Sequence, residues 1–485
     1  MGFGTLLNIL LIIPGLTFCY LARNGNVDQG VLIVSAGLFI FTLVARFCVF
    51  NKEYLWEHPL LGIALLFGIF ICGDILYRTE FRVEDLLLGG AATPPDEVTA
   101  DLERCKAILS FKRGYIIDDG QPTSRLRARA LLNKRLELAF GIDNAFTTTE
   151  KKYHNEFLSE SQRGLNIGNG DWSRLSQWAR PFARARIARE KETCNIVTVI
   201  QMMTLNMALQ IFLKRDDSSL LDDDLAQLAS AINRLWINSK SPDTIQPWAE
   251  QDQLHRILRN LTPESHHDPC SPWENPMNLI LPSYETLWRV VLRCFLELNF
   301  RPRHAAHAPR WRAAVRFFME NVGGWHMDNR TVNGISATDV AKEALRLYPP
   351  TRRVYRTTHS GRSVAADIET LHRDPAVWPG DGEARATNFC PERWMEDGVN
   401  QDAFLAFGAG PFACPARGGF GPKAVALLVG ALTEAVEVKD ERGRGWVVDG
   451  RFADVMAAEE PLGSGREAFD GLRLRRGGGG SEKSA

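Results

Sequence analysis

The sequence predicts a mainly α-helical protein with a smaller β part, an α+β fold, preceded by two or three transmembrane helices. Three observations support this prediction. Long apolar runs dominate the first 80 of the 485 residues, helical patterns extend from about residue 98 to about 345, and the chain after Pro349 is rich in turns and strand-like segments. With 45% hydrophobic and 24% charged residues, the chain beyond the apolar runs can bury a large core, which excludes a disordered protein.

The charge balance and the cysteines exclude several classes of protein. The 57 Lys and Arg against 58 Asp and Glu give a net charge of −1, so the chain lacks the basic surplus that holds a nucleic-acid backbone. The nine cysteines are scattered, odd in number and without a CxxC pair, which argues against a disulfide scaffold and a cysteine-rich zinc site. No nucleic-acid partner is expected, and the main domain is expected in a reducing compartment.

The membrane region is predicted over residues 1–80. Gly2–Leu21, Val31–Phe50 and Leu60–Tyr77 are mostly apolar, and each has about the 18 to 20 residues that a helix needs to cross a bilayer. Asp74 within the third segment is costly in hydrocarbon, which leaves the choice between two and three spans open. Cleavage of the first segment as a signal peptide is not favoured, because a basic start and a small-residue cleavage site are both missing.

A linker over residues 81–97, rich in Gly and Pro, separates this region from a domain predicted over residues 98–475. Strands are expected at Val354 and Tyr355 and at Trp446–Val448, and residues 476–485, with GGGGSEKSA, are expected to form a flexible tail. The clearest helical patterns are Thr123–Ala139, Ile196–Leu213, Leu221–Ile237 and Pro276–Leu298.

A Gly-rich loop in the segment Phe404–Ala435 brings a single cysteine, Cys414, to the start of an apolar helix. Gly408 and Gly410 permit tight turns and a close approach of the backbone to a flat ligand. Backbone N–H groups and the helix dipole at such a position favour an anionic thiolate. This arrangement is suited to a haem-iron ligand, and the alternative is an ordinary buried cysteine that follows a turn.

The residues around this cysteine resemble a known signature. In FGAGPFACPA, Phe407, Gly410 and Cys414 are similar to the cytochrome P450 pattern FxxGxxxCxG, and Ala416 takes the final small position. The resemblance implies a cytochrome P450-like fold in which Cys414 is the axial ligand of the iron of haem b, with Phe407 and Gly410 beside the cofactor. Phe412 replaces the basic residue often found two positions before the cysteine, so one contact to a haem propionate is expected to be missing.

Further motifs occur in the order that the family shows. Glu343 and Arg346 are three residues apart, share a helix face and resemble the family's ExxR pair. Arg393, in NFCPERW, matches the arginine that completes a buried ion-pair triad supporting the haem-binding core. Arg356 resembles an arginine that pairs with a haem propionate. The stretch 366–381, which contains His372 and Trp378, resembles the family's meander and is expected to be structural.

The expected oxygen-activation helix lies over residues 278–298. PSYETL is similar to the family pattern [AG]Gx[DE]T[TS], which implies that Glu285 and Thr286 are the catalytic acid and alcohol that deliver protons. Pro282 and Ser283 replace the usual small residues. Pro282 removes a backbone hydrogen bond and is expected to kink the helix. The alternative is an apolar core helix with an incidental Glu-Thr pair.

Upstream of residue 276 the resemblance is weak. His154 and the segment Trp172–Arg180 are candidates for the helix that grips the haem propionates, but neither shows the family's W-x-x-x-R spacing. No site is assigned there.

By resemblance, the chain is a haem-thiolate monooxygenase that inserts one oxygen atom from O2 into a hydrophobic small molecule. Electrons from NADPH would arrive through a membrane-bound NADPH–cytochrome P450 reductase. The motifs are similar in style to filamentous-fungal members of secondary metabolism, which suggests a terpenoid or polyketide intermediate as substrate. Contact with membrane lipid is expected, at the endoplasmic reticulum with the haem domain facing the cytosol. Two alternatives stay open: a haem-thiolate isomerase or dehydratase that needs no external electrons, and a non-catalytic membrane haem protein.

Overall fold

The structure, a computed structural model, describes nine stretches of the chain. The predicted transmembrane segments Gly2–Leu21, Val31–Phe50 and Leu60–Tyr77 lie outside them. Among the described helices, none combines the length and the apolar character that crossing a bilayer requires. The chain divides into two units between Gly90 and Ala91, and only the second unit contains described residues. These residues are 95–112, 122–190, 192–215, 221–264, 267–322, 334–357, 362–395, 399–436 and 445–477.

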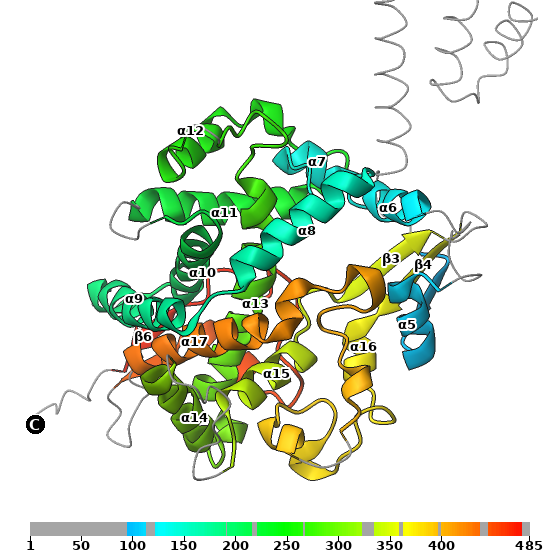
Figure 1. Ribbon diagram of the computed structural model, residues 1–485. Coiled ribbons are helices and arrows are strands. Elements are labelled where there is room, and N and C mark those ends of the chain that lie inside the picture. The colour runs from blue at the N-terminus through cyan, green and yellow to red at the C-terminus, as the bar shows by residue number, and fades with distance from the viewer. Residues whose placement is uncertain are drawn as a thin grey trace, which may run out of the picture. The chain divides into compact units, whose positions relative to one another are not determined.

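Helices make up most of the described chain and the strands are short, so the predicted mainly helical fold with a smaller β part is confirmed (Figure 1). The first helices are α5 (Leu102–Ser110), α6 (Pro122–Leu131), α7 (Lys134–Phe140), α8 (Lys151–Leu165), α9 (Asn169–Arg189), α10 (Ile196–Phe212) and α11 (Asp222–Asn238). The later ones are α12 (Asp252–Leu261), α13 (Met277–Phe300), α14 (Ala308–Asn321), α15 (Ala337–Leu347), α16 (Ile368–His372), α17 (Phe420–Ala435) and α18 (Ala453–Ala457).

Two three-stranded sheets complete the fold. In the first, the central strand β4 (Ser363–Asp367) pairs parallel with β1 (Glu97–Thr99) and antiparallel with β3 (Arg353–Thr357). In the second, β6 (Leu474–Arg476) lies between β2 (Thr193–Cys194) and β5 (Trp446–Val448), and both pairings are antiparallel. The second sheet therefore joins the end of the described chain to the segment that leads into α10.

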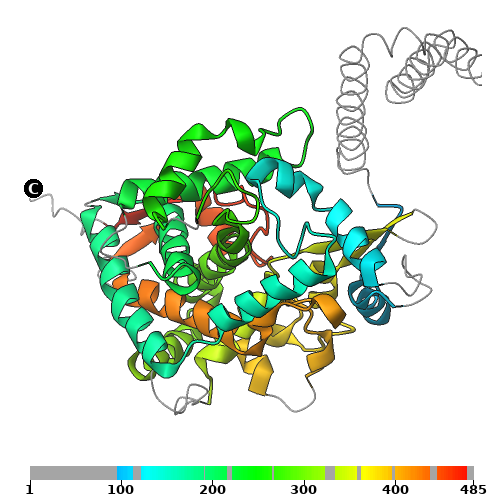
Figure 2. The ribbon, with the colours of Figure 1, turned by 45° about the horizontal axis from the view of Figure 1, so that its top comes forward.

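The core is built around α10, α13 and α17. α10 is apolar around almost its whole circumference, and its residues from Val199 to Ile211 are buried, which requires neighbours on every side. α13 packs against α10 and also contacts α14, α15 and α17, while α9 and α14 cover other faces of α17. In Figure 2, α13 and α17 run through the middle of the molecule. Residues on α13 and in the loop before α17 are thereby held by a rigid frame.

Two predicted boundaries are wrong. The pattern over Thr123–Ala139 forms two helices, because the chain turns at Leu132 and Asn133, where the Asn133 amide donates a hydrogen bond to the Arg129 carbonyl. Asn side chains commonly compete with helical bonding in this way. Arg476, placed by its composition in the flexible tail, instead pairs with Trp446 in β6. A middle strand needs only its backbone groups for pairing, so exposed arginines are tolerated there.

Pro282 lies inside α13, which the structure shows as one helix from Met277 to Phe300. Proline cannot donate a bond to the carbonyl four residues earlier, that of Asn278. The side-chain amide of Asn144 donates to this carbonyl at 3.1 Å. The hydrogen bond that Pro282 removes from the helix is thus replaced by one from a distant loop.

Candidate functional site

The loop that carries Cys414 is shaped by two glycines with positive φ. Gly408 has φ +69° and Gly410 has φ +67°, a region that residues with side chains rarely adopt. A Cβ on Gly410 would also lie 2.5 Å from the Cα of Ser110. The Cys414 N–H donates to the Phe407 carbonyl at 2.8 Å, and a short helical turn, Pro415–Gly418, follows before α17. The loop is therefore a tight and strongly constrained turn.

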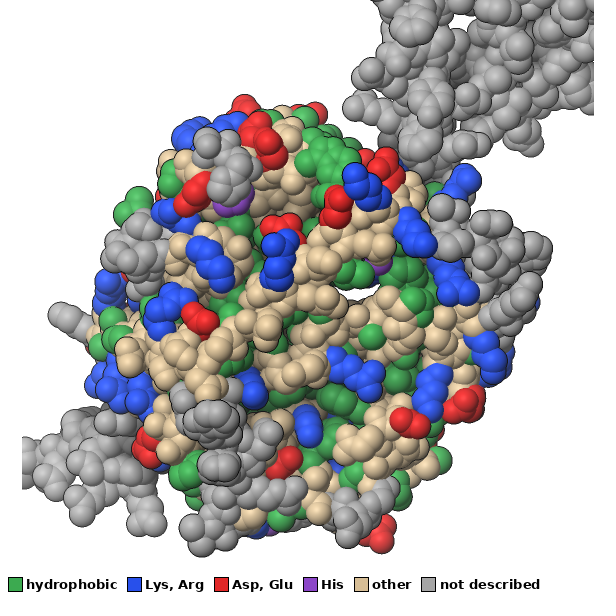
Figure 3. All heavy atoms as spheres, viewed as in Figure 1, with side chains coloured by type: hydrophobic (Ala, Val, Ile, Leu, Met, Phe, Trp, Pro, Cys, Tyr) green, Lys and Arg blue, Asp and Glu red, His purple; other side chains and the backbone are tan. Residues whose placement is uncertain are grey.

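Cys414 is an exposed residue, although protein surrounds its thiol on most sides. Figure 3 shows a hollow beside α8, over the part of the molecule where the loop before α17 lies in Figure 1. Desolvation by the surrounding protein raises the pKa of the thiol, whereas the Ala416 N–H and the Arg129 guanidinium act in the opposite direction. Both of these groups stabilise a thiolate.

The structure brings Glu343, Arg346 and Arg393 together in the core. Arg346 binds the Glu343 carboxylate with two hydrogen bonds of 2.9 and 2.7 Å, and both side chains are 0% exposed. The Nε atom of Arg393 lies 3.5 Å from the same carboxylate. Burial on its own raises the pKa of Glu343, but Arg346, Arg393 and the Cys390 N–H together hold the pKa below its ordinary value. The remaining Arg346 N–H groups donate to the carbonyls of His372, Ala386 and Asn388.

His372 connects this triad to the loop of Cys414. The Leu405 N–H donates to its Nε2 at 3.0 Å, so Nδ1 carries the proton and donates to the Arg346 carbonyl at 2.8 Å. Burial, and then the Arg346 charge, lower the pKa of His372 to about 3, and the ring is neutral at pH 7. Trp378 lies edge-on to the same ring. The triad therefore positions the start of the cysteine loop through a neutral histidine.

A second group of cations lies on another side of the cysteine loop. Arg356, on β3, is buried, and Arg129, on α6, is half-buried. Burial lowers the pKa of Arg356 to about 9, with a further contribution from Arg129, and lowers the pKa of Arg129 to about 10. In the described part of the chain, neither guanidinium forms an ion pair with a carboxylate, and Nε of Arg356 has no hydrogen-bond partner. These two neighbouring charges, one half-buried and one buried, have no counter-charge among the described residues.

Phe412 organises this second group. Its ring centroid lies 4.6 Å from the Arg129 guanidinium carbon, 5.1 Å from the Phe111 centroid and 5.6 Å from that of His154. Phe412 therefore supports Arg129 through a cation–π contact. His154 is buried with no partner at Nε2, and burial lowers its pKa.

Arg129 was not found from the sequence, because α6 contains several arginines in the pattern of a solvated helix and nothing local separates Arg129 from Arg127. The only sequence signal was the flanking pair of small residues, Ala128 and Ala130, which the structure buries. The segment Trp172–Arg180, also considered from the sequence, belongs to α9, where Arg180 pairs with Glu434 of α17.

On α13, the structure places Glu285 and Thr286 in separate interactions. The Glu285 carboxylate is buried and forms an ion pair with Arg466, from the loop between α18 and β6, while its Oε1 has no hydrogen-bond partner. The Thr286 hydroxyl donates to the Pro282 carbonyl at 2.9 Å. No hydrogen bond between the two side chains occurs in the described part of the chain.

Comparisons with known proteins agree with the motifs. A family model described as Cytochrome P450 matches residues 337–418, from α15 to the turn after Cys414. The chain is 41% identical over 88 residues to cytochrome P450 CYP13A8 of Caenorhabditis elegans, covering 16% of each protein. It is 32% identical over 112 residues to flavonoid-6-hydroxylase of Mentha piperita, covering 20% of this chain and 22% of that protein. The chain thus matches less than a quarter of the length of these relatives.

Among solved structures, CYP175A1 of Thermus thermophilus aligns with 78% of this chain and 88% of its own, with a TM-score of 0.47 and 17% identity. The segment from α15 to the cysteine turn is thus similar to the corresponding part of cytochrome P450 proteins, and the likeness in sequence is limited to this part of the chain.

The cofactor of that family is haem b, a flat ring with two propionate carboxylates, and the residues present fit it. Cys414 offers an exposed sulfur for the iron. Gly408 and Gly410 keep the backbone beside it free of side chains. Within the described ranges, Arg129 and Arg356 are two cations shielded from solvent and without an ion-paired carboxylate, so each can bind a propionate.

Proposed function

We propose that this chain is a haem-thiolate monooxygenase that inserts one oxygen atom from O2 into a small organic molecule. The observation that carries the proposal is the convergence of Cys414, Arg129 and Arg356 on one site. It combines one thiol that can bind iron with two guanidiniums that have no carboxylate partner among the described residues. When bound, a thiolate-ligated haem supplies the activation of dioxygen.

The residues of the chain have separate roles in this proposal. Cys414 binds the iron as a thiolate, stabilised by the Ala416 N–H and by Arg129. Arg129 and Arg356 bind the propionates, and Phe412 holds Arg129 in place. In this proposal Thr286 and Glu285 hold and pass protons. The hydroxyl oxygen of Thr286 can accept a hydrogen bond while donating to Pro282, and Oε1 of Glu285 has no hydrogen-bond partner of its own.

The partners follow from the same proposal. Electrons come from NADPH through NADPH–cytochrome P450 reductase, and the apolar segments in residues 1–80 anchor the enzyme in lipid. The proposed location is the endoplasmic reticulum, with the haem domain in the cytosol. The substrate is a largely hydrophobic intermediate of the terpenoid or polyketide type, as in filamentous-fungal secondary metabolism.

A spectrum of the full-length protein tests the proposal. After reduction and addition of carbon monoxide, we expect the red-shifted Soret band of a thiolate-ligated haem, because Cys414 is the thiol placed to bind the iron. In Cys414→Ser the shifted band should be absent. Cys270→Ser, at another exposed cysteine, is the matched control and should retain it. A shifted band that persists in Cys414→Ser would contradict the assignment.

Turnover with the reductase then separates the monooxygenase from the alternative reactions. A monooxygenase consumes NADPH and O2 and adds one oxygen atom to its product, whereas an isomerase or dehydratase forms product without NADPH. Product formation without NADPH would replace the proposed reaction.

A further inference from the structure

Two arginines from distant parts of the chain lie against one indole ring. The guanidinium carbon of Arg135, on α7, is 5.0 Å from the Trp236 centroid, and that of Arg466, in the loop before β6, is 4.3 Å from it. Arg135 also donates a hydrogen bond to Ser239, at the end of α11. Lys240 follows directly. Arg135, Lys240 and Arg466 therefore form a cationic cluster between α7, α11 and the loop before β6.

The cationic cluster has too few counter-charges. Arg466 pairs with Glu285, whereas Arg135 and Lys240 form no ion pair with any carboxylate of the described residues. Burial lowers the pKa of Arg135 to about 10, and burial together with Arg135 lowers that of Arg466 to about 9. Burial, then Arg466 and Arg135, lower the pKa of Lys240, and the Glu467 carboxylate offsets this in part. The three cations thus repel one another, and a further anion among them would relieve this repulsion.

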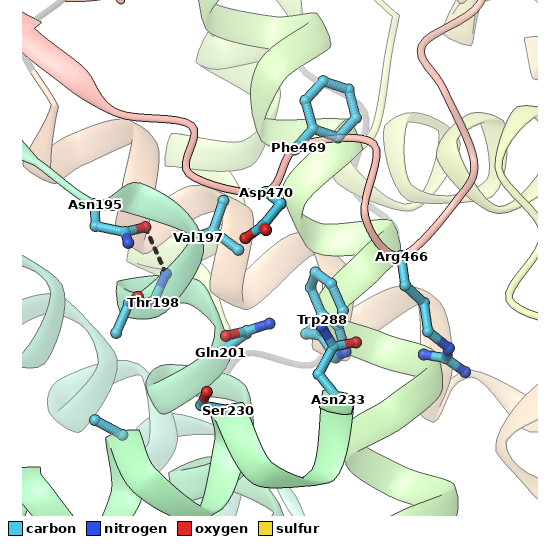
Figure 4. Close-up of a pocket in the computed structure, with 11 residues that line it drawn as sticks. Asn195, Val197, Thr198, Gln201, Ser230, Asn233, Trp288, Arg466, Phe469 and Asp470 are labelled. Atoms are coloured by element: carbon cyan, nitrogen blue, oxygen red, sulfur yellow. Dashed lines mark hydrogen bonds between the residues drawn. The ribbon is translucent and has the colours of Figure 1, made fainter. Parts of the chain in front are cut away.

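Arg466 also lines a polar cavity of about 200 Å³, shown in Figure 4. Trp288, on α13, lines the same cavity, is 1% exposed, and has an indole N–H without a hydrogen-bond acceptor. Gln201, on α10, adds a side-chain amide, and the carboxylate of Asp470 lines the same cavity (Figure 4). The cavity is smaller than the roughly 300 Å³ or more of a site for a drug-sized molecule, so its size suits one end of a ligand.

Arg466 therefore connects a cluster whose three cations share one ion-paired carboxylate, that of Glu285, to a cavity whose wall contains an N–H donor without an acceptor. A single negative charge suits this arrangement better than a dianion, because Glu285 and Asp470 are already nearby. Building on the monooxygenase function proposed above, we propose that the substrate carries a carboxylate. Arg466 and the Trp288 N–H bind this group in the cavity, and Arg135 and Lys240 supply the surrounding positive potential. The substrate is then an amphipathic acid rather than a purely hydrophobic molecule.

Paired probes test the proposal on the full-length, haem-loaded protein. Isothermal titration calorimetry at pH 7.5 compares decanoic acid, which is ionised, with its methyl ester, which has the same chain and no charge. We expect the acid to bind about 10-fold more tightly or more, as for a charge-assisted hydrogen bond. Added salt should weaken binding of the acid and leave that of the ester unchanged.

Three variants test which residues cause the preference for the acid over the ester. Arg466→Gln should abolish the preference for the acid. Arg466→Gln also leaves Glu285 without its partner, so a second variant is needed that does not endanger folding. Lys240→Gln serves this purpose because Lys240 is exposed. It should reduce the preference for the acid about 2- to 5-fold. Lys152→Gln, on the exposed face of α8, is the matched control and should keep it.

Equal affinity for the acid and the ester, or a preference that survives both Arg466→Gln and Lys240→Gln, would overturn the proposal. The same preparation is first tested with carbon monoxide. Absence of the shifted Soret band defeats the proposed function, whereas a normal band with equal affinities defeats only the carboxylate proposal.

Discussion

Two pairs of arginines near the cysteine loop differ in how their charges are compensated. Arg346 and Arg393 lie on Glu343, and backbone carbonyls accept their remaining N–H groups. Arg129 and Arg356 contact aromatic rings and form no ion pair with a carboxylate among the residues that the structure describes. A buried charge is costly unless it is paired. The first pair is therefore complete within the protein, whereas the second pair requires an anion from outside. This difference separates a structural cluster from a binding site.

The largest effect is expected from breaking the complete cluster. Glu343→Gln leaves Arg346 and Arg393 buried with no counter-charge, and we expect a loss of about 3–5 kcal/mol in the free energy of unfolding. Urea unfolding of the full-length protein, followed by circular dichroism, measures it. Glu103→Gln, in an exposed pair with Lys106, is the control and should change stability by about 1 kcal/mol or less. A similarly small loss in Glu343→Gln would show that the triad is not essential to the fold.

The incomplete cluster should behave in the opposite way. Arg356→Leu removes a buried, uncompensated charge next to Arg129, so the haem-free protein should keep or gain stability, by up to about 2 kcal/mol. Retention of haem should fall about 10-fold or more, because a charge-assisted bond to a propionate is lost.

Urea unfolding measures the change in stability, and transfer of haem to apomyoglobin measures the change in haem retention. Arg353→Leu is the matched control. Arg353 lies on the same strand, but its side chain is exposed and pairs with Asp367, so the change should leave haem retention unchanged. A haem-free protein strongly destabilised by Arg356→Leu would make Arg356 structural.

The smallest effect concerns His372, which connects the complete cluster to the cysteine loop. Its pKa is about 3 in the folded protein and about 6.5 when unfolded, so below pH 6.5 the unfolded chain binds more protons. Its contribution to stability is full above pH 6.5 and falls by up to about 1.4 kcal/mol per pH unit as the pH decreases. In His372→Gln this dependence should disappear between pH 7.5 and 5.

Unfolding free energies of the natural protein and the His372→Gln variant, measured at several pH values, check this expectation. Asp143 acts in the opposite direction, because burial raises its pKa to about 6. It is present in both proteins, so its effect cancels in the difference. Parallel curves would show that His372 titrates as it does in the unfolded chain.

The complete cluster was accessible from the sequence and the incomplete one only in part. Glu343 and Arg346 are three residues apart on one helix, and their distance along the chain from Cys414 resembles the spacing of the same motifs in the cytochrome P450 family. Arg129 reaches the site only because α6 and the cysteine loop pack together through Phe412, and no local spacing records that contact. The four long helical patterns and both strands were predictable from apolar periodicity and turn residues. The break at Asn133 was not, because it depends on one side-chain hydrogen bond.

The ion pair of Glu285 was likewise beyond prediction. Its partner, Arg466, lies 181 residues further on, in a loop without a regular pattern. The loop is fixed by backbone carbonyls: those of Gly463 and Gly465 accept hydrogen bonds from Arg293 of α13. Contacts of this kind use main-chain atoms, which every sequence supplies, and therefore leave no residue signature.

The hydrogen bond from Asn144 to the Asn278 carbonyl couples two positions that are otherwise unrelated. With Pro282 in place, an amide at position 144 replaces the missing helical bond. With a residue that has its own N–H at position 282, that amide would compete with the helix for the same carbonyl. The two positions are thus epistatic, and an engineered change at Pro282 in α13 needs a matching change at Asn144.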